Sequence, residues 1–214
     1  HEIVQGDKTG DTPLSDIVKA YIKEKYQKPG EVFLGVTQRL DRPTTGVVLF
    51  ARTSKALTRL NAMFQSHEQI QKTYWAIVEK NERLLGDKAN EAMRLENYLW
   101  RNEKQNKSFI VKAGTKDAKR AALSYKVIAK SERYMLLEIN LETGRHHQIR
   151  CQLAAIGLPI KGDLKYGANR SNPDGGISLH ARKIEFVHPV SKLPISITAP
   201  VPEDKLWCTL EQQI

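Results

Sequence analysis

Residues 72–79, KTYWAIVE, place the strongest restriction on how this chain can fold. The segment is rich in β-branched and aromatic residues and alternates with the two-residue period of a β-strand. Both phases of the alternation are largely apolar, with Thr73, Trp75 and Ile77 on one face and Tyr74, Ala76 and Val78 on the other. A strand that is apolar on both faces must be covered on both, so we expect it to be a central strand.

Other segments predict further strands and a set of helices. Helices are predicted where apolar residues recur every three to four positions, at 14–26, at 53–66 and from about His146 to Gly157. Strands are predicted for a short buried run, a pair and a hairpin: 47–51 (VVLFA), 122–128 with 134–141, and 178–189 with 191–200. No long linker or internal repeat interrupts the 214 residues, so we expect one domain spanning 1–214.

The charge of the chain points to an anionic partner. Lys and Arg number 34 against 24 Asp and Glu, which gives a net charge of +10 and a pI near 9.6. Such a balance is typical of nucleic-acid binding, although many proteins carry it for solubility. Part of this charge is concentrated in a polar region that fits either a solvated hairpin or an RNA-backbone contact surface: Lys104, Lys107, Lys112, Lys116, Lys119 and Arg120.

Cysteine usage and hydropathy indicate a cytoplasmic protein. Cys151 and Cys208 form no disulfide framework, and no run of about 18 apolar residues could serve as a membrane span. The first residues, HEIVQGDKTGD, lack the features of a signal peptide and resemble the end of a strand that enters a turn. We therefore expect a soluble, intracellular protein, and hypothesise that its natural beginning lies upstream of His1. We also expect it to be a monomer.

Several common site motifs are absent from the sequence. The histidines and cysteines show none of the spacings typical of metal sites, so no metal is expected. The patterns GxGxxG and GxxxxGKS are also missing, which gives no support for dinucleotide or nucleoside triphosphate binding. A GxSxG nucleophile elbow is missing as well, which argues against the simplest hydrolase.

Three short segments carry candidate chemistry. In RLDRPTTG, residues 39–46, Asp41 lies between two arginines, which fits either a surface ion pair or a carboxylate kept ionised for nucleophilic chemistry. Tyr74 fits either a core tyrosine or a site residue. TGRHHQIR, residues 143–150, is either an ordinary basic helix start or part of a site. Taken singly, none of the three decides the function.

In this order along the chain, the segments resemble the RluA family of RNA pseudouridine synthases. RLDRPTTG resembles the family's HRLDxxTSG, KTYWAIV its K-x-Y-x-A, and TGRHHQIRCQLAAIGLPIKGDLKYG its TGRxHQIR…GxPIxGDxxYG block. SLHARKIEFVHPVSKLPISITAP resembles the family's carboxyl-terminal LHA…HP…AP pattern, so the match runs from about Val36 to Pro202. Gln38 and Thr45 depart from the usual His and Ser. The family's first strand, with its KPxG motif, is not found.

The resemblance implies an α+β fold and an enzyme that acts on RNA. The expected fold is a central mixed, largely antiparallel sheet with surrounding helices and loops and an active-site cleft. The expected reaction is isomerisation of specific uridines in ribosomal or transfer RNA to pseudouridine, without metal, redox cofactor or ATP. The chain has no room for an S4 RNA-binding domain. The alternatives are a non-catalytic RNA-binding module in ribosome assembly and, more weakly, a glycosidase, which would need two carboxylates.

The resemblance also implies a role for individual residues. Asp41 would be the catalytic carboxylate, and Arg150 would pair with it and depress its pKa. Tyr74 would stack near the uracil and serve in proton removal, which requires a special environment for a phenol. The candidate contacts to RNA or to the target uridine are Arg39, Arg42, Arg145, His147 and Leu179.

Overall fold

The computed structural model describes residues 3–6, 10–66, 69–81 and 91–214. Its helices are α1 (Leu14–Lys25), α2 (Ser54–Ser66), α4 (Gln148–Ala155), α5 (Lys205–Glu211) and the short 3-10 helix η2 (Leu164–Tyr166). Its strands are β1 (Gly35–Val36), β2 (Thr45–Gly46), β3 (Phe50–Ala51), β4 (Ile70–Glu79), β5 (Met93–Asn102), β6 (Lys107–Val111), β7 (Lys119–Lys130), β8 (Tyr134–Leu141), β9 (Leu179–Val187) and β10 (Pro194–Thr198). Within these ranges, no helix has the length and apolar character needed to cross a membrane.

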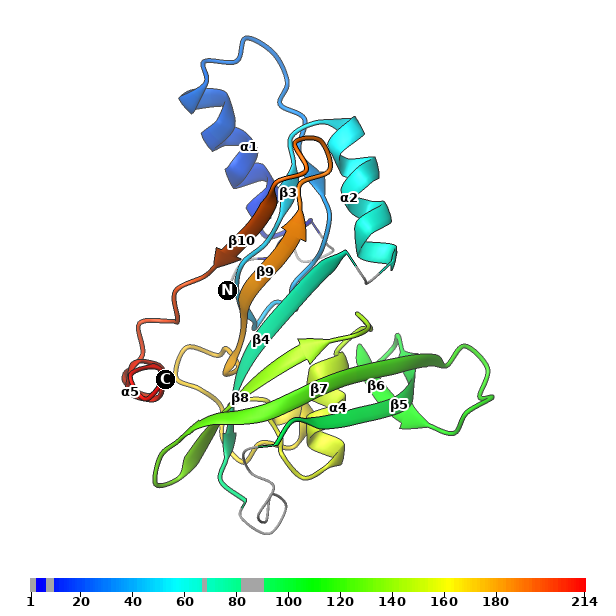
Figure 1. Cartoon of the computed structure of the whole chain (residues 1–214), viewed down its shortest axis with the longest axis vertical. Coiled ribbons are helices and arrows are strands. Elements are labelled where there is room, and N and C mark those ends of the chain that lie inside the picture. Colours follow the sequence, from blue (N-terminus) through cyan, green and yellow to red (C-terminus); the bar gives the residue numbers. More distant parts are fainter. Residues whose placement is uncertain (1–2, 7–9, 67–68, 82–90) are drawn as a thin grey trace.

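Eight strands form the main sheet (Figure 1). Seven of them run in the order β10-β9-β4-β8-β7-β5-β6, and every neighbouring pair in this order is antiparallel. The eighth, β2, pairs in parallel with β9, and β1 pairs with β3 in a separate two-stranded sheet. The expected α+β fold with a mixed, largely antiparallel sheet is therefore confirmed.

The segment 72–79 lies in the middle of this sheet, as its two apolar faces predicted. It belongs to β4, which is hydrogen-bonded to β8 on one side and to β9 on the other. Ile77 belongs to a buried cluster with Trp207 of α5, whereas Val78 belongs to a cluster with Leu153 of α4. The strand is apolar on both faces because a different helix covers each of them.

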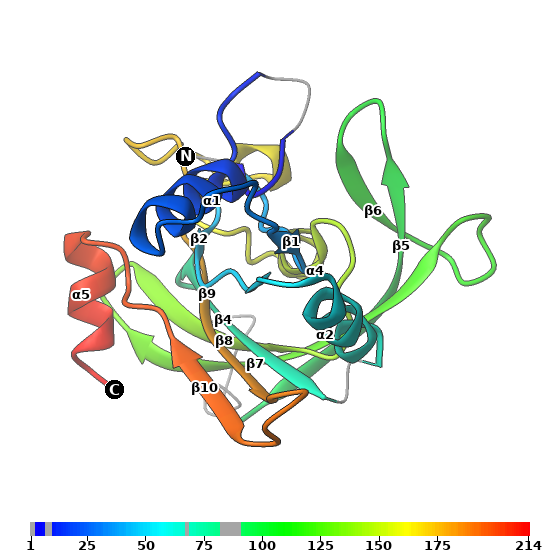
Figure 2. The same cartoon turned by 90° about the horizontal axis from the view of Figure 1, so that it is seen from above.

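The helices other than α5 define the side of the sheet on which a site can form. Seen from above, α1, α2 and α4 lie on the same side of the sheet, and the β5–β6 hairpin rises at one end on that side (Figure 2). Helix α4 begins directly after the turn that follows β8, so its first residues lie close to the centre of the sheet. The loop between β1 and β2, early in the chain, and the turn before α4, late in the chain, can therefore meet on this side of the sheet.

Two local predictions are wrong. The run 47–51 is not one buried strand, because Gly46 pairs with β9 in the main sheet whereas Phe50 pairs with β1 in the small sheet. The chain changes sheets between these two residues, which leaves 47–49 outside regular structure and half-buried. Residues 3–6 are also not the end of a strand; the carbonyl of Ile3 instead accepts a hydrogen bond from the amide of Leu14 at the start of α1.

Candidate active site

One cleft of about 760 Å³ is lined by all of the predicted catalytic residues and all of the predicted RNA or uridine contacts. Its volume falls in the range of about 300–1,000 Å³ that is usual for small-molecule sites. The predicted catalytic and binding residues that line it come from four separate parts of the chain: Arg39, Asp41, Arg42, Tyr74, Arg145, His147, Arg150 and Leu179. Segments that are distant in sequence therefore form one site.

Asp41 lies in the loop between β1 and β2. The end of this loop is attached to β9 at several points. β2 aligns Thr45 with His180 and Gly46 with Ala181, and the side chains of Thr45 and His180 are hydrogen-bonded at 2.8 Å. A Cβ atom on Gly46 would lie 2.3 Å from the carbonyl oxygen of Ala181. Its φ of 117° also lies in a region that L-residues rarely adopt, so only glycine allows this close pairing. The loop that carries Asp41 is therefore held by the sheet.

Arg150 connects the Asp41 loop to a second carboxylate. Its Nε and Nη2 atoms donate to the two oxygens of Asp163 over 2.7 and 2.8 Å, and its Nη1 atom donates to Asp41 Oδ2 over 3.2 Å. Arg150 is 5% exposed and Asp163 is 1% exposed. The predicted contact between Arg150 and Asp41 is present, but the closer, bidentate partner of the arginine is Asp163.

The balance of charges at Asp41 differs from the prediction. Burial in the cleft raises the pKa of Asp41 above its usual value, and the nearby Arg150 guanidinium opposes this by lowering it. The arginine lowers the pKa as predicted, but the net shift is upward because desolvation of the carboxylate, which the sequence did not reveal, is the larger effect. The arginine therefore limits a shift that burial alone would make larger.

Tyr74 lies on β4 beside Asp41 and lines the same cleft. Burial raises the pKa of the Tyr74 phenol, and the negative charge of Asp41 raises it further. The phenol consequently keeps its proton at neutral pH. This environment does not provide the activation that a tyrosine base requires, so the ring and the O–H group are what Tyr74 offers to a substrate.

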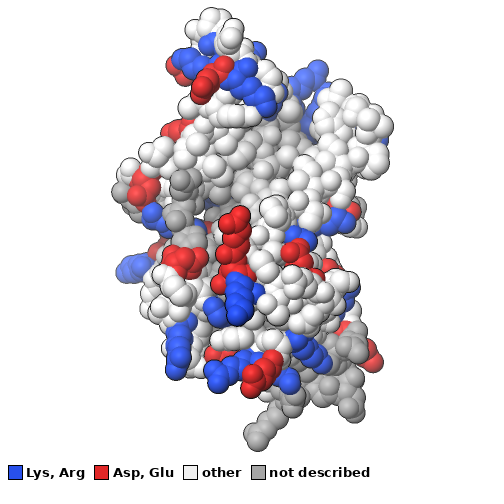
Figure 3. Space-filling model, turned by 90° about the vertical axis from the view of Figure 1, so that its left-hand side faces the viewer, with Lys and Arg blue, Asp and Glu red and all other residues white. Residues whose placement is uncertain are grey.

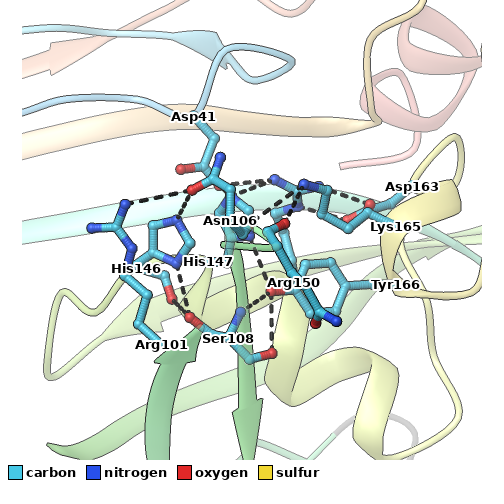
Figure 4. A network of polar contacts seen from close by, with 11 residues as sticks. Asp41, Arg101, Asn106, Ser108, His146, His147, Arg150, Asp163, Lys165 and Tyr166 are labelled. Atoms are coloured by element: carbon cyan, nitrogen blue, oxygen red, sulfur yellow. Dashed lines mark hydrogen bonds and ion pairs between the residues drawn. The ribbon is translucent and has the colours of Figure 1, made fainter. Parts of the chain in front are cut away.

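The two histidines before α4 belong to a hydrogen-bond network below Asp41 (Figure 4). His146 contacts Ser108 Oγ through Nδ1 at 2.9 Å and Asn106 Oδ1 through Nε2 at 3.0 Å. His147 contacts the Tyr166 hydroxyl through Nδ1 at 3.0 Å. The network ties the start of α4 to the β5–β6 hairpin and to η2.

The predicted RNA contacts differ in how exposed they are. Arg39 is exposed at the cleft, and Arg42 is exposed but forms an ion pair with Asp11. Arg145 is half-buried and donates from Nε to the carbonyl of Arg120 over 2.9 Å.

The two remaining predicted contacts are buried. Leu179 packs in the core and lines the cleft, as a residue that touches the uracil would. His147 is only 7% exposed, and its ring is surrounded by protein groups, so a direct RNA contact does not fit its position.

Several residues of the cleft and of the hydrogen-bond network around Arg150 and His147 were given no role from the sequence. Asp163 and Tyr166 lie in GDLKYG, which was quoted for the resemblance, so their position in a motif was the available signal. Lys72 precedes Tyr74 by two residues on the same strand and lines the cleft, where burial lowers its pKa. Ser108 and Asn106 lie in the polar region 80–120 and carry no sequence signal.

The charged residues of the cleft are almost all basic. Among the residues that the structure describes, seven Lys or Arg residues line it and Asp41 is its one acidic residue. By contrast, side chains of both signs mix on the face seen from the side of α1, β10 and α5 (Figure 3). The lining of the cleft is therefore more uniformly basic than that face, and it suits a polyanionic ligand. Within the described ranges, no group of three or more His, Cys, Asp or Glu residues could hold a metal ion.

Comparison with known proteins agrees with this site. The profile of the RNA pseudouridylate synthase family matches residues 3–155. Ribosomal large subunit pseudouridine synthase D of Xylella fastidiosa is 34% identical over 79% of this chain and 52% of its own length. tRNA pseudouridine synthase C of Vibrio cholerae is 33% identical over 79% of this chain and 72% of its own length. The chain spans about half the length of several of the curated relatives it matches.

The fold of the chain is also found among solved structures. Human RNA Pseudouridylate Synthase Domain Containing 4 superposes with a TM-score of 0.73 at 20% identity, covering 99% of this chain and 92% of that protein. Human RNA Pseudouridylate Synthase Domain Containing 1 superposes with a TM-score of 0.66 at 19% identity, covering 96% and 85%. Together with the profile match and the curated relatives, these likenesses lead to one conclusion: the chain belongs to the RNA pseudouridylate synthase family.

Proposed function

We propose that this chain isomerises uridine to pseudouridine in RNA, with Asp41 as the catalytic carboxylate. The observation that carries the proposal is the position of Asp41, which is the one acidic residue among the described residues of a cleft lined by seven basic ones. It contacts Arg150 and lies beside Tyr74. Membership of the family supports the same reaction. The proposed isomerisation is redox-neutral and needs no electron carrier.

The reaction exchanges one bond of the uridine for another. The N1–C1′ glycosidic bond breaks, the uracil turns, and a C5–C1′ bond forms; C5 loses a proton and N1 gains one. Asp41 has to be ionised to assist the cleavage, and Arg150 favours that ionised form. Tyr74 and Leu179 supply an aromatic and an aliphatic surface for the flat uracil ring. Because the Tyr74 phenol keeps its proton, we assign it to stacking and hydrogen-bond donation.

The target uridine must leave its base stack to reach Asp41. Flipping a nucleotide costs a few kcal/mol, which contacts to the RNA backbone have to offset. Arg39, Arg145 and Lys72 line the cleft and are placed for such contacts. The relatives named above are called ribosomal large subunit and tRNA synthases, so ribosomal RNA and transfer RNA are the two substrate classes to test. A cytoplasmic monomer remains our prediction for the intact protein.

The experiment is release of tritium from RNA labelled at C5 of uridine. Wild-type protein should release tritium from ribosomal or transfer RNA, and Asp41→Asn should release none while still binding the same RNA. Asp117→Asn is the matched control, because Asp117 is exposed in the turn between β6 and β7 and should behave as wild type. Release by Asp41→Asn at the wild-type rate would remove Asp41 from the chemistry. Binding of RNA without release by the wild type would favour a non-catalytic RNA-binding module.

A further inference from the structure

We propose that His147 is a positioning residue for Arg150: its Nε2 atom accepts a hydrogen bond from Nη1 and so directs the second Nη1 proton at Asp41. The inference rests on the proposed function, because it explains how Arg150 is held at the reacting carboxylate. This positioning role takes the place of the RNA contact that the sequence predicted for His147.

Hydrogen bonds account for the orientation of the Arg150 guanidinium. Asp163 accepts from Nε and Nη2, which fixes one edge of the planar group. The Nη1 atom on the other edge carries two protons, and it lies 3.0 Å from His147 Nε2 and 3.2 Å from Asp41 Oδ2. One proton is therefore available for each acceptor. The ring of Tyr166 lies 5.1 Å from the centre of the guanidinium and supports its face. Without the histidine, Nη1 would keep Asp41 as its one hydrogen-bond acceptor within the described part of the chain, and the edge of the guanidinium nearest Asp41 would be held less firmly.

The geometry also determines the tautomer of His147. A guanidinium has no acceptor, so Nε2 must be unprotonated where it meets Nη1. The ring proton is then on Nδ1, from which it is donated to the Tyr166 hydroxyl at 3.0 Å. The amide of Ser108 also donates to this hydroxyl over 2.8 Å and fixes the oxygen in place. Tyr166 thereby selects the tautomer in which Nε2 accepts.

The electrostatic surroundings keep this imidazole neutral. Burial, followed by the charge of Arg150, lowers the pKa of His147 to about 2. Nε2 lies 3.6 Å from Asp41 Oδ2 but carries no proton to donate to it, so His147 acts on Asp41 only through the arginine. The ionisable groups that surround His147 and Asp41 in the site are Arg150, His146, Lys165, Arg101, Asp163, Tyr74 and Tyr166.

The backbone guides the choice of variants. His147 has a φ of 51°, in the left-handed region where Asn is among the best tolerated residues. His147→Asn can keep this backbone and a polar group near Tyr166, but it has no atom at the position of Nε2. His147→Gln can place an amide oxygen near that position and is the variant expected to rescue activity. His188→Asn, in the turn between β9 and β10 and outside the cleft, is the matched control.

The first experiment measures the pH profile of tritium release. In His147→Asn, kcat should fall, roughly 100-fold if the guanidinium is misplaced by about 1 Å, whereas KM should change little. The acid limb of kcat/KM should move to higher pH, because a weaker contact with Arg150 leaves the pKa of Asp41 higher. His147→Gln should recover part of kcat and move the limb back, and His188→Asn should match the wild type.

The results that would overturn the proposal are specific. A higher KM with unchanged kcat in His147→Asn would make His147 an RNA contact, and an unmoved acid limb would leave it a merely structural residue. Nitrogen-15 NMR of the imidazole rings in wild-type protein tests the geometry without any reaction. A proton on Nε2 of His147 would refute the proposal, whereas absent tritium release by wild type with the Nδ1–H tautomer intact would refute only the proposed function.

Discussion

Arg150 and Asp163 form a buried, bidentate ion pair that joins helix α4 to the loop before η2, with N–O distances of 2.7 and 2.8 Å. The same guanidinium reaches Asp41 from its other edge at 3.2 Å. Asp163 is almost completely buried, and Asp41 is open to the cleft. One carboxylate therefore holds the arginine, and the arginine holds the other carboxylate where a substrate can reach it.

Asp163→Asn should destabilise the protein and reduce its activity. Removing one partner of a buried ion pair leaves the other charge uncompensated and costs about 3–5 kcal/mol. Urea unfolding monitored by circular dichroism measures this loss. Glu142→Gln is the control, because its bidentate pair with Arg94 is exposed and should matter little. A free energy of unfolding equal to wild type in Asp163→Asn would show that the pair does not hold Arg150.

Gly46→Ala should disrupt the loop that carries Asp41. The added Cβ would meet the backbone of Ala181 at 2.3 Å, and the positive φ alone costs about 1–3 kcal/mol. Both the melting temperature and tritium release should fall. Gly114→Ala separates the two causes, since Gly114 has a φ of 85° but open space around it. Equal losses in the two variants would mean that the contact with β9 contributes nothing.

Thr45→Val should weaken the attachment of the same loop. The substitution keeps the shape of the side chain but leaves Nδ1 of the buried His180 without its hydrogen bond, which costs about 1–3 kcal/mol. Differential scanning calorimetry measures the change. Thr58→Val, at an exposed position on α2, is the comparison and should lose much less. The prediction fails if both variants melt at the same temperature.

Asp41→Asn should stabilise the folded protein at neutral pH. Burial raises the folded-state pKa of Asp41, so the carboxyl favours folding when protonated, and this contribution is lost as pH rises through that pKa. The amide side chain in Asp41→Asn does not ionise, so the variant does not lose this folding stability at neutral pH. Urea unfolding at pH 7 and near pH 3 should show a gain over wild type that shrinks in acid, whereas Asp117→Asn should show no gain. A gain of the same size at both pH values would exclude ionisation as its cause.

Buried histidines should make the protein sensitive to mild acid. Burial lowers the folded-state pKa of His180, and burial with Arg150 lowers that of His147 to about 2, so the unfolded chain binds protons first. Stability present above pH 6.5 is lost as pH falls below it, by up to about 1.4 kcal/mol per pH unit for each histidine. His180→Asn, which keeps an acceptor for Thr45, should make the decline shallower in urea unfolding. An unchanged slope would contradict this.

Local sequence patterns predicted most elements because they reflect local physics. The periodicity of 14–26 and 53–66 gave helices that agree with α1 and α2 to within one residue at each end. The prediction of one strand over 47–51 was wrong because apolar content does not reveal a change of sheet. Such a change depends on partner strands far away in sequence.

Within the site, the sequence identified individual groups but not their balance. Motif order identified Asp41, Tyr74 and Arg150, and the fold brings all three to one cleft. The lowering effect of Arg150 on the pKa of Asp41 was predicted, but the larger, opposite effect of burial was not, because burial cannot be read from neighbours along the chain. The pairing of Arg150 with Asp163 was likewise invisible, because it spans 13 residues and two separate elements.

The sequence by itself determined the family, the central place of β4 and the candidate catalytic and RNA-contacting residues that line the cleft. These follow from composition, periodicity and motif order, which are properties of short segments. Only the tertiary structure decided that Asp163 holds Arg150, that His147 is enclosed by protein and that Tyr74 keeps its proton. The reason is physical: hydrogen-bond partners and desolvation depend on which distant segments pack together, and no local pattern records that.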